Sequence, residues 1–74
     1  MTYRIAFYEG GKFSTRIGQP YDRKDSALFA LGEIYADISR LFPVNADAPD
    51  SITYDRYGTP CMVRIEETEE DQCL

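Results

Sequence analysis

One apolar stripe in the middle of the chain constrains the fold more than any other feature. Apolar residues recur there at spacings of three and four, which is the pattern of an amphipathic helix that buries one face. The residues of this stripe are Ala27, Leu28, Leu31, Ile34, Tyr35, Ile38, Leu41 and Phe42. Pro43 ends the pattern, because the residue before a proline is pushed out of helical backbone angles. We expect Asp22 or Asp25 to cap the N-terminus of the helix.

The segments on both sides of this helix alternate between apolar and polar residues with a period of two, as β-strands do. Residues 2–8 and 12–17 form one predicted hairpin, and residues 52–56 and 61–65 form a second. The segment 44–51 between the helix and the second hairpin contains Asp, Asn, Ala and Pro, so we expect a loop there.

The register of the first hairpin follows from keeping its apolar side chains on one face. A three-residue Glu9-Gly10-Gly11 loop pairs Phe7 with Phe13 and leaves one face apolar. A two-residue loop at the glycines would pair Phe7 with Ser14 and place charge opposite core side chains. We therefore expect the three-residue loop.

Two hairpins around one helix predict an α+β fold with the element order ββαββ. The simplest packing is a four-stranded sheet with the helix on one face. A right-handed crossover favours the first and fourth strands as parallel central neighbours, which gives the order 2-1-4-3. In topology this resembles the small immunoglobulin-binding domains and, more loosely, the β-grasp, although no residue motif of those families is present. We expect residues 1–65 to form this single domain and residues 66–74 to form an acidic C-terminal tail.

The net charge of −5 is unevenly distributed. The five acidic residues of the segment 66–74 account for all of it, because the rest of the chain holds eight acidic and eight basic residues. An acidic end of this kind is either a solubilising terminus or a segment that steers the chain toward a basic partner.

Several classes of function are disfavoured by composition. The chain has no His, which removes the commonest general base. Cys61 and Cys73 are twelve residues apart, which is not the spacing of a metal site. We therefore expect no enzymatic activity, no cofactor and no metal. Without an export signal or a membrane-length apolar run, we expect a cytoplasmic protein, no membrane contact and reduced thiols.

Three surfaces could contact a partner: the outer face of the helix, an exposed tyrosine on the sheet, and the acidic end. Phe29 stands on the helix beside small and acidic residues and has the shape of an interface anchor. The residues that we expect to bind a partner are Phe29, Glu33, Asp37, Tyr8, Glu66, Glu67, Glu69, Glu70 and Asp71.

These surfaces favour a small, acidic, non-enzymatic module that binds a protein. A specific form of this hypothesis is a phage- or mobile-element-encoded inhibitor of a host defence complex. It would resemble anti-CRISPR proteins in type and compete with nucleic acid for a basic groove. The alternative is a nucleic-acid-binding domain that uses the basic outer face of the sheet. That face is expected to carry Arg4, Lys12, Arg16 and Arg64. A single aromatic on that face and the negative net charge both disfavour the alternative.

Overall fold

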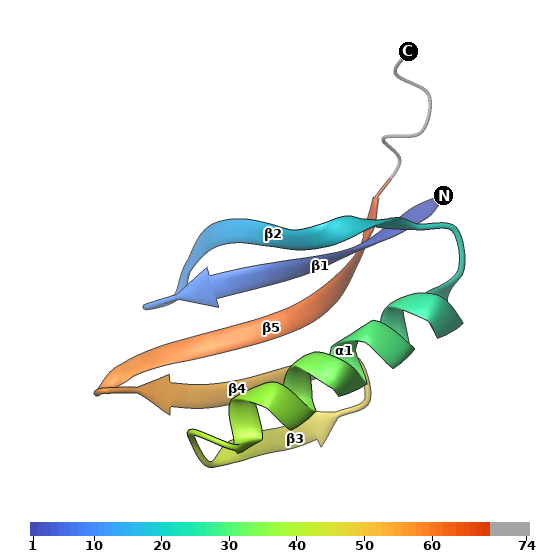
Figure 1. Ribbon diagram of the computed structural model, residues 1–74. Coiled ribbons are helices and arrows are strands. Elements are labelled where there is room, and N and C mark those ends of the chain that lie inside the picture. Colours follow the sequence, from blue (N-terminus) through green and yellow to red (C-terminus); the bar gives the residue numbers. More distant parts are fainter. Residues whose placement is uncertain (69–74) are drawn as a thin grey trace.

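A five-stranded antiparallel sheet carries a single helix across one face in the computed structural model, which describes residues 1–68 apart from the side chain of residue 47 (Figure 1). The elements are β1 (Thr2–Glu9), β2 (Lys12–Tyr21), α1 (Lys24–Ser39), β3 (Val44–Ala48), β4 (Ser51–Arg56) and β5 (Thr59–Thr68). The order of strands in the sheet is β2-β1-β5-β4-β3. The predicted α+β class, with one helix on one face of a sheet, is confirmed.

The prediction of four strands is wrong, because the segment expected to be a loop contains β3. This edge strand pairs only with β4, where Val44 lies opposite Tyr54 and Asn45 opposite Thr53. Its sequence of Val, Asn, Ala, Asp and Ala is poor in β-forming residues, so only its pairing with β4 identifies it.

The extra strand also reverses the direction of every strand after it. The four predicted strands correspond to β1, β2, β4 and β5, and their neighbours in the sheet are as expected. However, β1 and β5 run antiparallel and not parallel. The order 2-1-4-3 is therefore incomplete, and the topological resemblance to the immunoglobulin-binding domains does not hold.

The first hairpin turns on two glycines, so the expected three-residue loop is wrong. Gly10 and Gly11 have φ values of 62° and 82°, and positive φ at both central residues defines the tight turn that suits a twisted hairpin. Ser14 forms a bulge one step later: Tyr8 lies opposite Phe13, but Phe7 lies opposite Thr15. The bulge shifts the register by one residue from Thr15 onward. Phe7 and Ile5 therefore lie opposite Thr15 and Ile17, and no charged residue faces a core side chain as a regular two-residue loop would require.

The core lies between the helix and the face of the sheet that it covers. Its buried members are Ile5, Ala27, Leu31, Ile52, Tyr54, Cys61, Val63 and Ile65. The rest of the core is only partly buried, including four of the residues predicted to pack there. Those four are Phe7, Leu28, Ile34 and Ile38.

The helix differs from its prediction at both ends. Arg23 occupies the N-cap position, and no side chain caps the first turn, so neither Asp22 nor Asp25 acts as the expected cap. Asp25 lies within the first turn, 3.3 Å from the Arg23 guanidinium. The helix ends at Ser39, which leaves Leu41 outside the apolar stripe and largely exposed. No helix among residues 1–68 is long and apolar enough to cross a membrane.

The last strand runs three residues beyond its expected end at Ile65. Glu66 lies opposite Arg4 and Glu67 opposite Tyr3, because β1 offers backbone partners along its full length. The hydroxyl groups of Thr2 and Thr68 are 2.7 Å apart at the end of this ladder. Glu66 and Glu67 therefore belong to the sheet, whereas the predicted tail residues Glu69, Glu70 and Asp71 lie outside the described residues.

Candidate functional site

The face of the sheet that points away from α1, here termed the open face, is crossed by one row of side chains with one residue from each strand. Read from β3 to β2, the row is Asn45, Thr53, Met62, Tyr8 and Phe13. None of the described elements covers this face (Figure 1). The uncovered face of an antiparallel sheet is normally polar, so this row, with a methionine and two aromatic rings, is an exception.

Phe13 belongs to the open face because of the Ser14 bulge. The sequence predicts Phe13 opposite Phe7, on the core side. In the structure Phe13 pairs with Tyr8, and the two rings meet edge to face with centroids 5.7 Å apart and planes at 78°. The open face therefore holds two aromatic side chains where one was expected.

Two guanidinium groups lie over these rings. The Arg64 guanidinium is 5.0 Å from the centroid of Tyr8, and the Arg16 guanidinium is 5.9 Å from the centroid of Phe13. Both distances are within the range of a cation–π interaction. We refer to Tyr8, Phe13, Arg16 and Arg64 as the aromatic–arginine cluster.

Glu66 anchors one end of this cluster. The Tyr8 hydroxyl donates a hydrogen bond to the Glu66 carboxylate, and the Arg64 guanidinium contacts the same oxygen through Nε at 3.1 Å and Nη2 at 3.0 Å. The hydrogen bond from Tyr8, together with the hydrogen bond and charge of Arg64, holds the pKa of Glu66 below its ordinary value, although partial burial opposes this. Glu66 is therefore a fixed negative charge at neutral pH.

Long side chains fold over the centre of the open face. Ala6 alternates with the core-facing Ile5 and Phe7 and so belongs to the open face, yet it is 0% exposed. Its cross-strand neighbours are Arg16 on β2 and Arg64 on β5, whose stems cover the small side chain. The cluster is thus packed onto the sheet and not simply extended into solvent.

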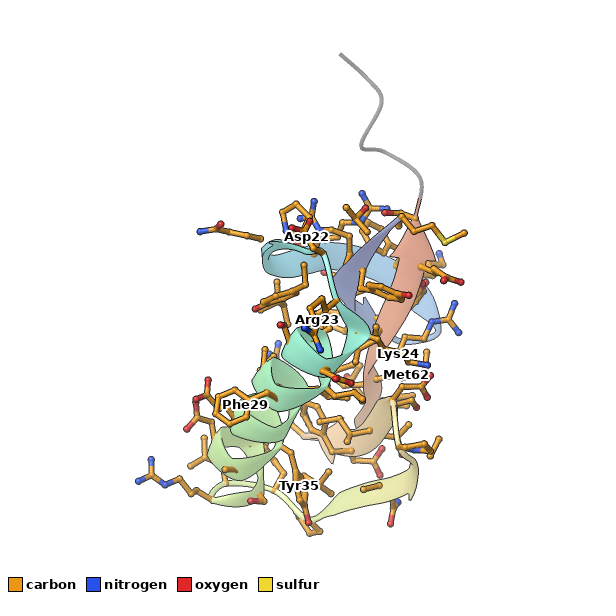
Figure 2. The ribbon with its side chains drawn as sticks, turned by 90° about the vertical axis from the view of Figure 1, so that its right-hand side faces the viewer. Asp22, Arg23, Lys24, Phe29, Tyr35 and Met62 are labelled. Atoms are coloured by element: carbon orange, nitrogen blue, oxygen red, sulfur yellow. The ribbon has the colours of Figure 1, made fainter. Side chains whose placement is uncertain are left out.

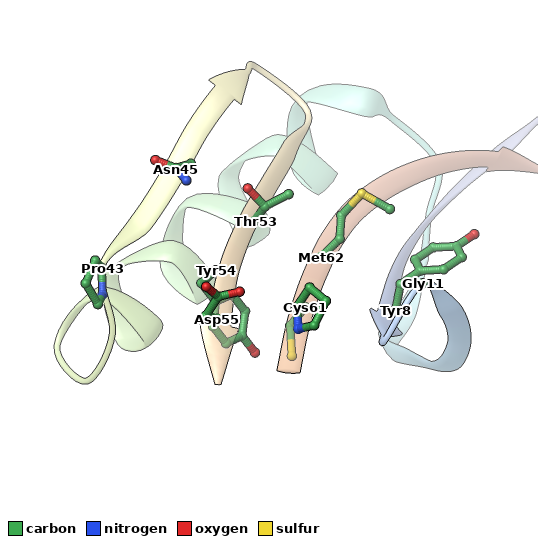
Figure 3. Close-up of a pocket in the computed structure, with 10 residues that line it drawn as sticks. Tyr8, Gly11, Pro43, Asn45, Thr53, Tyr54, Asp55, Cys61 and Met62 are labelled. Carbon is green, nitrogen blue, oxygen red and sulfur yellow. The ribbon is translucent and has the colours of Figure 1, made fainter. Parts of the chain in front are cut away.

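A groove of about 550 Å³ lies beside the cluster on the open face (Figure 3). Its lining is dominated by apolar groups and comes from four strands and the turns next to them. The lining residues are Tyr8, Gly11, Pro43, Asn45, Thr53, Tyr54, Asp55, Pro60, Cys61 and Met62. Tyr8 joins the groove to the aromatic–arginine cluster, so the two features form one continuous surface.

The outer face of α1 is a separate surface on the other side of the molecule. Phe29 is 73% exposed, and Glu33 and Asp37 are exposed beside it, as the helical pattern predicts. Figure 2 shows Phe29 and Met62 on opposite sides of the molecule. The residues expected to bind a partner are therefore not brought together: Phe29, Glu33 and Asp37 lie on one side, and Tyr8 and Glu66 on the other.

The basic residues expected on the open face are also divided. Arg16 and Arg64 lie there, and Arg4 lies across from Glu66 on the same face. Lys12 pairs with Glu9, which lies two residues beyond the core-facing Phe7 and therefore on the same side of β1. The bulge thus puts Lys12 on the side of the sheet that faces α1. The Arg4 guanidinium donates a hydrogen bond to the Gly18 carbonyl at 3.3 Å.

One exposed aromatic was missed entirely by sequence reasoning. Tyr57 occupies the two-residue turn between β4 and β5 with a φ of 52°, a left-handed conformation that side chains other than Asn, Asp and Gly rarely adopt. Its ring is 92% exposed and meets the Phe42 ring edge to face at 5.5 Å. The sequence predicts the turn, between residues 56 and 61, but the ring of Tyr57 was not singled out as a surface feature.

The remaining chemistry is limited. Cys61 is buried with its Sγ 3.6 Å from the Thr59 carbonyl oxygen, and Cys73 lies outside the described residues. Among residues 1–68, no group of three or more His, Cys, Asp or Glu side chains could hold a metal ion. No protein-family model, no curated protein and no solved structure matches this chain.

Proposed function

We propose that this chain is a small non-enzymatic module that binds another protein through the open face of its sheet. The observation that carries the proposal is a groove of about 550 Å³ that adjoins a packed aromatic–arginine cluster on a face that none of the described elements covers. Aromatic and arginine side chains beside a concavity are the composition of an interface hot spot. Such anchors bind well because their geometry is fixed before the partner arrives.

The chemistry of the groove supports a binding role and not a catalytic one. Of the residues that the structure describes, its lining offers one carboxylate, that of Asp55, and no Lys, Glu or His. General acid–base catalysis needs two groups with separated pKa values within reach of one substrate. Cys61 contributes to the lining but is buried against the core.

The charge arrangement on the open face favours a protein over a nucleic acid. Glu66 is paired with Arg64 at one end of the cluster, so it offsets part of the positive charge of the two guanidinium groups. The net charge of −5 opposes binding to a phosphate backbone.

One observation favours the alternative, a nucleic-acid-binding sheet. Phe13 beside Tyr8 supplies a second ring on which a base could stack, with Arg16 next to it. Binding of single-stranded oligonucleotide at physiological salt is therefore the competing outcome in the test below.

A more specific form of the proposal is an inhibitor encoded by a phage or mobile element that occupies the nucleic-acid groove of a host defence complex. Its support is the small size of the chain and its net charge of −5, which suit a competitor for a basic groove.

Site-specific photo-crosslinking tests the proposal. A photoreactive amino acid replaces Thr53, on the row of the open face, or Asp37, on the outer face of α1. Both residues are exposed, so neither change should disturb folding. We expect a protein adduct from position 53 that survives nuclease treatment and is absent from position 37. An adduct from position 37 alone, or a nuclease-sensitive adduct from position 53, would contradict the proposal.

A further inference from the structure

We propose that the groove on the open face receives an arginine or lysine side chain from a basic protein surface, with Asp55 as the carboxylate that pairs with it. The inference rests on the proposed function, because it names the chemistry of the partner at the same face. It is carried by three features of the groove: its charge, its apolar lining and its polar rim.

Among residues 1–68, Asp55 is the only charged group in the lining of the groove. It is exposed and lies opposite Pro60, which contributes no charge and no N–H group. Glu9, Asp50 and Glu66 each pair with a cation of this chain, at 3.2, 3.9 and 3.0 Å. Within residues 1–68, by contrast, Asp55 has no ion pair, so its carboxylate remains available to a cation from outside.

The rest of the lining suits the hydrocarbon stem of a long cationic side chain. Met62, Pro60, Pro43 and the Tyr8 ring provide apolar surface, and a Lys or Arg stem packs on such surface while its charged end stays near solvent. Methionine adapts its shape readily to such an occupant. An acidic side chain is shorter and would meet the charge of Asp55 with repulsion.

Polar groups converge from the neighbouring strands. Figure 3 shows Thr53 and Asp55 on β4 and Asn45 on β3, on the same side of the groove. The hydroxyl of Thr53 and the amide oxygen of Asn45 can accept hydrogen bonds, and a guanidinium group has five N–H donors to distribute. The groove therefore matches a cation with several donors.

The charge of the whole chain acts in the same direction. The net charge of −5, which residues 66–74 supply, attracts a basic partner to the molecule within about one Debye length, roughly 8 Å at physiological salt. The long-range field thus selects a basic partner, and the groove beside Asp55 selects one cationic side chain on it.

A titration of the full isotope-labelled chain with Nα-acetyl-arginine methylamide, followed by backbone amide shifts, tests the inference. Nα-acetyl-citrulline methylamide, which has nearly the same shape but no charge, is the control ligand. We expect the arginine compound to shift the amides of Thr53, Asp55 and Met62. The citrulline compound should bind about two- to fivefold more weakly, the range of an exposed ion pair.

Two variants separate Asp55 from general acidity. Asp55→Asn should reduce the affinity for the arginine compound to that of the citrulline compound, whereas Asp37→Asn, of equal charge change, should leave it unaltered. Equal binding of both compounds to the parent, or an undiminished affinity of Asp55→Asn for the arginine compound, would overturn the inference. Failure of the proposed function is distinguishable, because it would appear as crosslinking from position 37 while the titration still succeeds.

Discussion

The two outer surfaces of this protein differ in how their exposed side chains are held. On the outer face of α1, Phe29 is 73% exposed and stands beside Glu33 and Asp37. On the open face, Tyr8 is fixed by the Glu66 carboxylate, by the Phe13 ring and by the guanidinium over it. The first surface is only accessible, whereas the second is both accessible and preorganised.

Exposure alone is therefore a weak guide to an interface. A single exposed aromatic is ordinary on a protein surface. Several fixed side chains that converge beside a groove reduce the entropy lost on binding, because their rotamers are already set. The comparison predicts that changes on the helix face will be mild and that changes on the open face will affect binding.

The largest effect is expected on the unfolding free energy, where substitutions on the two sides of α1 should differ. Leu31 is 3% exposed and packs in the core, so Leu31→Ala should cost about 2–5 kcal/mol of unfolding free energy. Phe29→Ala should change it by less than about 0.5 kcal/mol, because its ring faces solvent. Urea unfolding of both variants measures this. A large loss in Phe29→Ala would mean that its ring contributes to the core.

Two glycine variants should change the stability in opposite directions. Gly58 has a φ of 89° in the turn between β4 and β5, so Gly58→Ala should cost about 1–2 kcal/mol. Gly32 lies in α1, where an added Cβ would meet nothing within 4 Å, so Gly32→Ala should stabilise by about 0.5–1 kcal/mol. Melting temperatures of the two variants should move in opposite directions. Destabilisation by Gly32→Ala would show that the outer face of the helix is packed after all.

A smaller effect is expected in the pH dependence of stability. The folded-state pKa of Glu66 is lowered, first by the Tyr8 hydrogen bond and then by Arg64. Its stabilising contribution is therefore present above the ordinary carboxyl value of 4.5 and is lost as the pH falls through the lower folded-state pKa. Glu66→Gln should be less stable than the parent at pH 7 but converge with it at pH 3.

Glu33→Gln, on the outer face of α1, is the matched control for this measurement. Its urea midpoint should stay the same distance from that of the parent at both pH values. If Glu66→Gln and Glu33→Gln behave alike, the network around Glu66 contributes nothing to folding.

Much of the fold could be predicted from the sequence because the helix and the long strands have strong periodic patterns. The neighbours of β1, β2, β4 and β5 agree with the prediction, but the parallel crossover from which their order was argued does not occur, because β1 and β5 run antiparallel. The strand β3 could not be predicted in the same way. Its five residues alternate between apolar and polar, but four of them are Ala, Asn or Asp, which are poor β-formers, and pairing with the edge of β4 makes them a strand.

The candidate site was less predictable, because the bulge at Ser14 determines which side chains lie on the open face. The Ser14 bulge moves Phe13 from the core side to the open face and places Lys12 on the other side. A bulge has no strong local sequence signal, since it depends on which register buries more apolar surface across the whole hairpin. The groove is also hidden from sequence, because its lining comes from separate strands and turns and includes an edge strand that was not expected.

The decisive measurement is the dissociation rate of the non-covalent complex with the partner that crosslinking identifies, because it tests whether the open face is the interface. Met62→Ala removes apolar surface from the groove, and Phe29→Ala removes the exposed ring from the opposite side. Loss of a central anchor acts mainly on dissociation. We predict that Met62→Ala speeds dissociation at least about tenfold, the effect of roughly 1.4 kcal/mol, and that Phe29→Ala leaves it unchanged. Faster dissociation in Phe29→Ala, with Met62→Ala like the parent, would contradict the account and assign the interface to the helix.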